Sequence, residues 1–303
     1  MTLASLKKIF TLTENENGYI ISKYRSKEPI VEIPAYIDDK PVIAIGEMAF
    51  KGKDIEEITI PDTVTLIGER AFCECKKLSK ITLPKDAKID HVAFYDCSNL
   101  ADEKGFVIVN NILFRYMGSD KDAIIPDGVV AIDNGAFERS KTLESITIPN
   151  SVKFIGNAAF YGCRKLSSVK ILNLETDIHR SAFESCPKLL DKNGFVIFID
   201  YLYQYLGEHE HVTIPDTVKT IGEGAFPYSK TIKSITIPPT VTTIGTSAFM
   251  RTSAGLESVI IPDSVISIGP KAFAMCDKVT ITAPKGSYAV EYAIASNIPY
   301  IEI

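Results

Sequence analysis

The chain has 303 residues, of which 46% are hydrophobic, and a formal net charge of −5. This acidic balance offers no basic field for nucleic acid or for an anionic membrane surface. No run reaches the roughly 18–20 apolar residues that a membrane-spanning helix needs. We therefore predict a folded protein that neither binds nucleic acid nor inserts into a membrane.

The first 41 residues differ from the rest of the chain. Lys7 and Lys8 are not followed by an apolar run, so the sequence shows no secretory signal. Residues 1–17 are polar, and we expect them to be partly ordered at most. The stretch 18–40 has the apolar pattern of a degenerate repeat. We predict that residues 1–41 form an N-terminal segment and a coil that caps the open end of a repeat stack.

One short pattern, Ile-Gly-x-x-Ala-Phe, organises the chain between residues 42 and 284, with Asp or His replacing Gly in three copies. Its Phe residues are Phe50, Phe72, Phe94, Phe137, Phe160, Phe183, Phe226, Phe249 and Phe273. They are 22–24 residues apart, except for two intervals of 43 residues. A regular period of this length predicts a solenoid, in which each repeat is one coil stacked on the next.

A single coil can be followed from Leu143 to Cys163. Leu143-x-x-Ile146-x-Ile148 ends in the alternation of a half-buried strand, and Pro149 ends that strand because it has no N–H to donate. Four positions before each Phe stands a residue type that is enriched at positive φ, so we predict a left-handed corner there. The nine positions are Gly46, Gly68, Asp90, Asp133, Gly156, His179, Gly222, Gly245 and Gly269.

The two long intervals carry matching extra segments. Near residues 104–119 and 193–208, two apolar runs flank a polar step, which predicts a β-hairpin in each. At residues 285–303, Ser287 is a plausible N-cap for a helix over residues 288–296, and residues 300–303 have the pattern of a strand. We predict that this segment caps the last coil.

Five of the six cysteines lie three residues after a repeat Phe. They are Cys75, Cys97, Cys163, Cys186 and Cys276, and Cys73 alone lies off this column. Other coils place Lys, Ser or Thr there, which favours a small, buried, weakly hydrogen-bonding side chain. Disulfides between neighbouring coils remain the alternative, and zinc is disfavoured because no Cys-x-x-Cys or Cys/His pair has ligand spacing.

The sequence contains no pattern of catalytic chemistry. His209, Glu210 and His211 form the one histidine cluster, which we interpret as a solvated loop, with adventitious metal binding as the alternative. His91 and Cys97 could form a nucleophilic pair only if the thiol were exposed, and its column predicts burial. We therefore assign no catalytic, cofactor-binding or metal-binding residues.

Two surfaces are candidates for binding a partner. Outward side chains of the repeat strands include Glu57, Lys80 and Lys170, and the alternative is a solvated sheet face. The outward positions are Glu57, Thr59, Lys80, Thr82, Ser145, Thr147, Ser168, Lys170, Ser234, Thr236, Ser258 and Ile260. Tyr201, Tyr203 and Tyr205 of the second hairpin have the amphipathic rings that interfaces favour, and the alternative is packing onto neighbouring coils.

The full pattern, Leu-x-x-Ile-x-Ile-Pro-(Asp/Asn)-(Ser/Thr)-Val-x-x-Ile-Gly-x-x-Ala-Phe-x-x-Cys, resembles the BspA-like leucine-rich repeats of bacteria over about residues 18–303. The resemblance implies a right-handed leucine-rich-repeat superhelix with parallel sheets. It also implies a cell-surface or secreted protein involved in adhesion, with a host protein, a surface protein or a glycan as partner and no cofactor. Our first hypothesis is a non-enzymatic protein-binding module, and the alternative is a structural or self-associating scaffold without a specific ligand.

Overall fold

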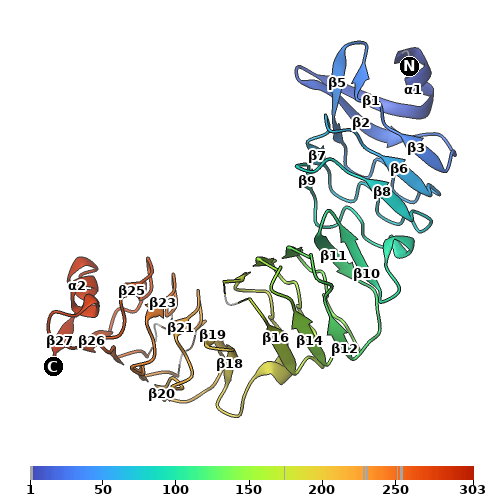
Figure 1. Ribbon diagram of the computed structural model, residues 1–303. Coiled ribbons are helices and arrows are strands. Elements are labelled where there is room, and N and C mark those ends of the chain that lie inside the picture. Colours follow the sequence, from blue (N-terminus) through green and yellow to red (C-terminus); the bar gives the residue numbers. More distant parts are fainter. Residues whose placement is uncertain (1–2, 174, 228, 230, 251, 253–254) are drawn as a thin grey trace. The chain divides into compact units, whose positions relative to one another are not determined.

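The computed structural model describes residues 3–173, 175–227, 229, 231–250, 252 and 255–303. The chain is a β-solenoid of about 12 turns with parallel sheets and few helices, as the repeat predicts. Its helices and strands are labelled in Figure 1. The chain divides into two compact units. The first unit comprises residues 1–143, 149–163 and 173–185, and the second comprises residues 144–148, 164–172 and 186–303.

The first unit contains three sheets, ordered β1-β2-β5-β7-β9 with β4 paired to β5, β3-β6-β8, and β10-β11-β13-β15-β17. Its elements are α1 (Leu3–Ile9), β1 (Phe10–Asn15), β2 (Gly18–Tyr24), β3 (Ile30–Glu32), β4 (Tyr36–Ile37), β5 (Lys40–Ile45), β6 (Glu57–Thr59), β7 (Leu66–Ile67), β8 (Lys80–Thr82), β9 (Lys88–Ile89), η1 (Ser98–Leu100), β10 (Phe106–Val109), β11 (Ile112–Tyr116), β12 (Asp122–Ile124), β13 (Ala131–Ile132), β15 (Phe154–Ile155) and β17 (Asp177–Ile178).

The second unit contains the parallel pair β14-β16 and the sheets β18-β19-β21-β23-β25 and β20-β22-β24-β26-β27. Its elements are β14 (Ser145–Ile148), β16 (Ser168–Ile171), η2 (Pro187–Leu189), β18 (Phe195–Phe198), β19 (Tyr201–Tyr205), β20 (His211–Thr213), β21 (Thr220–Ile221), β22 (Ser234–Thr236), β23 (Thr243–Ile244), β24 (Ser258–Ile260), β25 (Ser267–Ile268), β26 (Thr280–Ala283), α2 (Tyr288–Ala295) and β27 (Tyr300–Glu302).

The core of each unit is a stack of aromatic rings. In the first unit, Phe50 and Phe72 are stacked with centroids 5.1 Å apart, and Phe160 and Phe183 lie 4.7 Å apart at 5° between ring planes. In the second unit, Phe249 and Phe273 are stacked at 4.9 Å. These distances match the strand spacing of a sheet, because consecutive coils are one strand apart. The Ala before each Phe is buried and leaves room for the rings.

The two predicted hairpins are coils in which Tyr takes the place of Phe. The N–H of Tyr116 donates to Ala136 O at 2.8 Å, as the N–H of Phe50, Phe137 or Phe226 donates to the carbonyl of the Ala in the following coil. Its ring lies 4.9 Å from that of Phe137. Tyr24 and Tyr205 make the same two contacts with the coils of Phe50 and Phe226: an N–H bond to the Ala carbonyl and a ring contact with the Phe. The solenoid therefore has more turns than the nine that the Phe count alone indicates.

The hydroxyl group explains why these three positions carry Tyr. The hydroxyl of Tyr24 donates to Glu28 O at 2.7 Å, and the hydroxyl of Tyr116 accepts from the N–H of Asp120 at 3.1 Å. In each case the partner lies four residues further along the chain. The hydroxyl therefore holds the backbone that follows the ring.

The predicted left-handed corner is in the wrong place. None of the nine positions four before Phe has positive φ; the left-handed residues lie two before the Phe and two after it. Ala158, for example, has φ 54° and Gly162 has φ 69°. A left-handed backbone and a close neighbouring atom would each favour Gly at these positions, and the structure shows the close neighbour. A Cβ atom on Gly156 would lie 2.6 Å from Asn134 Oδ1 and 2.8 Å from Asn134 N of the preceding coil.

Asp90 and His179 replace Gly in the last coil of the first two runs of three regular coils. In four other coils, the residue two positions before Phe donates its backbone N–H to a carbonyl of the next coil. The N–H of Gly135, for example, donates to Asn157 O at 3.0 Å. The coils of Asp90 and His179 are followed by hairpins. There the side chain itself accepts this N–H: Asp90 Oδ1 from Val92 at 3.0 Å, and His179 Nδ1 from Ser181 at 3.2 Å.

Both ends of the chain contribute an aromatic ring to the nearest stack. We expected little order in residues 1–17, but the described residues from 3 onward form α1 and β1, and Phe10 is 2% exposed against Tyr24 and Phe50. At the other end α2 places Tyr292 6.2 Å from Phe273. Ser287 occupies the predicted N-cap position, although its side chain makes no capping bond. None of the described helices is long and apolar enough to cross a lipid bilayer.

The spatial explanation of the glycine column can be tested at neighbouring positions. Gly156→Val should lower the free energy of unfolding by about 1–3 kcal/mol, because the added atoms collide with the preceding coil. Ala158→Gly should raise it by up to about 1 kcal/mol, because Ala158 is the residue in the left-handed region. Urea denaturation of both variants measures the difference. If Ala158→Gly destabilised the protein as much as Gly156→Val, the assignment of the two columns would be incorrect.

Candidate functional site

The cysteine column is part of the core. All six cysteines are buried thiols outside any disulfide. The thiol of Cys75 donates to Phe50 O at 3.0 Å, and Cys163 donates to Phe137 O at 3.1 Å, each reaching the carbonyl of the preceding coil. Thr252 makes the same bond to Phe226 O at 3.0 Å. Cys and Thr interchange in this column because both donate the same hydrogen bond between coils.

Burial disfavours the thiolate form of Cys75 and Cys97. Desolvation raises the pKa of Cys75 to about 12, and it raises the pKa of Cys97 as well. The thiol of Cys97 donates to Phe72 O, whereas exposed His91 lies 3.6 Å from Asp90. The structure therefore does not assemble the Cys–His pair considered from the sequence.

The histidine cluster is likewise divided among separate partners. His209 Nδ1 lies 3.2 Å from the hydroxyl of Tyr205, and His211 Nδ1 lies 2.8 Å from Ser234 Oγ. Glu210 forms an ion pair with Lys233 at 2.8 Å, which lowers the pKa of Glu210 and raises the pKa of Lys233. Within the described part of the chain, no group of three His, Cys, Asp or Glu side chains could hold a metal ion.

Two of the three candidate tyrosines are core residues. Tyr203 and Tyr205 are 3% and 2% exposed, so we correct their assignment to a partner-binding surface. The ring of Tyr205 packs against Phe195 at 4.7 Å, and that of Tyr203 against Phe198 at 5.5 Å. The physical reason is that a two-stranded hairpin is stable only when one of its faces is buried. Tyr201 is half-buried and keeps part of its ring at the surface.

The three charged candidates lie on outward positions of the repeat strands. Glu57 of β6 is directly opposite Lys80 of β8, and Lys80 Nζ lies 3.0 Å from Glu57 Oε2. The side chains of Lys80 and Glu57 are 68% and 44% exposed, so this pair contributes about 0–1 kcal/mol to stability. Lys170 of β16 is exposed and opposite Thr147 of β14. A role for these three residues in partner binding stays a prediction.

The outward face of the sheet β20-β22-β24-β26-β27 differs from these surfaces. Its strand register aligns His211 with Ser234, Ser258 and Thr280 in one row, and it aligns Thr213 with Thr236, Ile260, Thr282 and Ile301 in a second row. We call these nine residues the hydroxyl face. None of them is Asp, Glu, Lys or Arg, and the inward neighbours Val212, Ile235, Val259 and Ile281 are buried.

Charged groups lie along the border of the hydroxyl face. Glu210 and Lys233, one residue before His211 and Ser234, form the ion pair described above, and exposed Glu257 precedes Ser258. An uncharged centre bordered by charged residues is the composition typical of a protein-binding surface. The sequence identified Ser234, Thr236, Ser258 and Ile260 as outward. It missed the other five members, because their alignment depends on a strand register that only the structure supplies.

A model of the BspA type leucine rich repeat region, in 6 copies, matches residues 35–104, 107–193 and 197–297. A comparison with curated proteins finds no match.

Solved structures that are similar to the chain include three bacterial proteins. A leucine rich cell surface protein from Faecalibacterium prausnitzii A2-165 is 23% identical, with 94% of this chain and 96% of that chain covered and a TM-score of 0.38. A leucine-rich repeat protein from Bacteroides ovatus ATCC 8483 is 26% identical, with 90% and 83% covered and a TM-score of 0.41. A leucine rich repeat protein from T. pallidum is 20% identical, with 95% and 93% covered and a TM-score of 0.31.

The buried thiols predict a loss of stability at alkaline pH. Between the unfolded pKa near 9 and the folded pKa of about 12, Cys75 holds its proton only in the folded state. The unfolded state then binds fewer protons, so the free energy of unfolding falls as pH rises, by about 1.4 kcal/mol for this thiol at pH 10. Urea denaturation at pH 8 and pH 10 under reducing conditions measures the change.

Cys75→Ser provides the matched control, because Ser140 occupies the same column in another coil and serine can still donate to Phe50 O. Tyrosine and lysine side chains also titrate near pH 10, and they are shared by both proteins. The difference between the two pH slopes therefore isolates the thiol. Equal slopes would contradict the proposed contribution of Cys75.

Proposed function

Since the chain belongs to the BspA type leucine-rich repeat family, we propose that it is a non-enzymatic binding module whose hydroxyl face contacts a protein partner. The family supports a role in protein interaction or at a surface. The uncharged centre of the hydroxyl face is the observation that carries the finer proposal. A location at the cell surface, and a host or glycan partner, stay predictions.

Burying a charged group in an interface costs free energy because the group loses its hydration. An interface that covers Glu57 or Lys80 would have to desolvate both groups of the ion pair, which offsets much of the gain from contact. The hydroxyl face has no such cost, since its Thr and Ser side chains both donate and accept hydrogen bonds. Ile260 and Ile301, which are 44% and 55% exposed, add apolar area in the same row. A neutral partner surface with its own hydrogen-bonding groups fits this composition.

The thiols and histidines considered from the sequence have structural partners. The thiols donate to backbone carbonyls, and the histidines of the second unit contact Tyr205 and Ser234. A structural or self-associating scaffold remains the alternative function. It predicts binding of this chain to itself and to no other protein.

The chain supplies its own fold-neutral substitutions for a test. Thr236→Lys places a lysine where another coil carries Lys170, and Ser258→Lys places one where another coil carries Lys80. Each should weaken the complex with a captured protein partner at least tenfold, because a charge in the centre of an interface is buried without a counterion. Biolayer interferometry measures the affinity, and thermal melting should show little change.

The reciprocal variants Lys80→Ser and Lys170→Thr are the controls, and they should leave the affinity within about twofold. If these controls lost binding while Thr236→Lys retained it, the interface would lie on the charged strands rather than on the hydroxyl face. Light scattering of the purified chain distinguishes the scaffold, which would show self-association that Thr236→Lys does not affect.

A further inference from the structure

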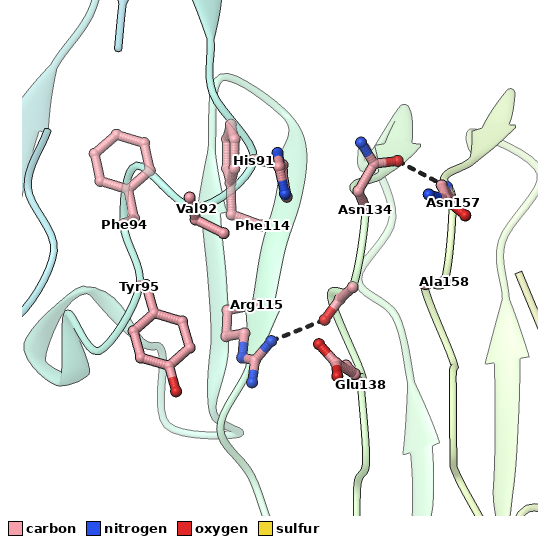
Figure 2. A pocket seen from close by; sticks show the side chains of 11 residues that line it. His91, Val92, Phe94, Tyr95, Phe114, Arg115, Asn134, Glu138, Asn157 and Ala158 are labelled. Atoms are coloured by element: carbon pink, nitrogen blue, oxygen red, sulfur yellow. Dashed lines mark hydrogen bonds between the residues drawn. The ribbon is translucent and has the colours of Figure 1, made fainter. Parts of the chain in front are cut away.

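A cavity of about 170 Å³ lies beside the hairpin β10–β11 in the first unit (Figure 2). Its walls come from residues 91, 92, 94 and 95, from Phe114 and Arg115 of β11, from residues 134, 135 and 138, and from residues 157–158. It forms where a hairpin replaces a regular coil: the ring of Phe114 meets that of Phe94 edge-on, at 5.3 Å and 79°, instead of stacking on it. This edge contact gives the cavity an apolar wall.

The guanidinium group of Arg115 is fixed in this cavity by two contacts. Its Nη1 donates to Gly135 O at 2.9 Å, and its Cζ lies 5.4 Å from the centre of the Tyr95 ring. Figure 2 shows the group between Tyr95 and Glu138. A guanidinium carries five N–H donors, and within the described part of the chain only one of them is used. The guanidinium group, which is held in place, therefore has unused N–H donors for a planar anion such as a carboxylate.

Two other polar side chains of the cavity wall matter: Asn134 adds a hydrogen-bond donor, and Glu138 adds a negative charge. Asn134 Oδ1 accepts from the N–H of Asn157 at 2.7 Å, which orients its amide and leaves the NH₂ end to donate. Glu138 is the acidic group of the wall, and its Oε1 lies 3.5 Å from Arg139 Nε. Glu138 therefore weakens the positive potential at Arg115 without pairing with it.

The second hairpin shows that the fold does not require these side chains. Arg115 precedes Tyr116, and the residue before Tyr205 is Gln204. Tyr95 follows Phe94, and the residue after Phe183 is Glu184. Pro227 stands at the place of Glu138. The same coil and hairpin are thus built without the arginine, its aromatic support and the acid, so their combination in the first unit calls for a reason other than folding.

We propose that this cavity binds a carboxylate group of side-chain size, presented by an Asp or Glu residue of a protein partner. The volume holds about five or six water molecules at roughly 30 Å³ each, and it is below the roughly 300 Å³ of a typical pocket for a small organic ligand. The carboxylate contacts the guanidinium of Arg115, and its methylene stem packs against Phe94 and Phe114. The site is independent of the hydroxyl face, which lies in the other unit.

The test uses the full chain, labelled with ¹⁵N, and two capped tripeptides, acetyl-Gly-Glu-Gly-amide and acetyl-Gly-Gln-Gly-amide. The acidic peptide should shift the Arg115 Nε–H and Gly135 N–H resonances saturably, with a dissociation constant of about 1–10 mM. The Gln peptide should bind at least tenfold more weakly. Added salt should weaken the binding of the acidic peptide, because the contact is ionic.

Variants of the cavity complete the test. Arg115→Gln copies the residue of the second hairpin and should lower the affinity for the acidic peptide at least tenfold. The melting temperature of the protein should not change. Arg115→Lys keeps the charge but loses the fork, and it should restore part of the affinity. Glu138→Gln removes a repelling charge and should tighten binding.

Two results would overturn the proposal. One is equal affinity for the Glu and Gln peptides, or for the protein with and without Arg115. The other is an absence of shifts with the acidic peptide at about 20 mM. A parallel titration with free glutarate separates the sources of the carboxylate: binding of glutarate without the peptide would overturn the assignment to a protein side chain.

Discussion

The structure depends on one contact that recurs between consecutive coils of a run: the N–H of the ring residue donates to the carbonyl of the Ala in the next coil. Phe137 makes this bond to Ala159 at 2.7 Å, and Tyr205 makes it to Ala225 at 2.7 Å. The bond sets the separation of the coils, which brings their rings to stacking distance and their corner backbones into close approach. Glycine at the corner, the small Ala and the Cys or Thr donor are all consequences of that separation.

Much of this architecture could be predicted from the sequence, because the repeat multiplies every local signal. The alternation in Ile146-x-Ile148 predicted the strand, and the paired apolar runs predicted the hairpins that the structure shows. The reason for the glycine at Gly156 could not be predicted, since a left-handed backbone and a close neighbour both select the same residue. Tyr116 and Tyr205 were visible in the sequence, but their equivalence to the repeat Phe required the hydrogen bonds of the structure.

The candidate surfaces show the same limit. Alternation alone placed Glu57, Lys80 and Lys170 on the outward side of their strands, and the structure agrees. It could not show that Tyr203 and Tyr205 point into the core, because an aromatic hairpin has two faces and the sequence does not state which is covered. The hydroxyl face and the Arg115 cavity join residues that no motif links, and both arise from register between coils.

Asp90 and His179 have a consequence for how such a chain can change in length. Each provides, from its own coil, the acceptor that a following coil would otherwise supply. The corner N–H in the last coil of the run therefore has an acceptor within its own coil, before the hairpin begins. Segments of about 88 residues could then be gained or lost during evolution without a new partner for the corner N–H at the junction. The number of coils would be free to vary in steps of a whole block while the junction chemistry stays the same.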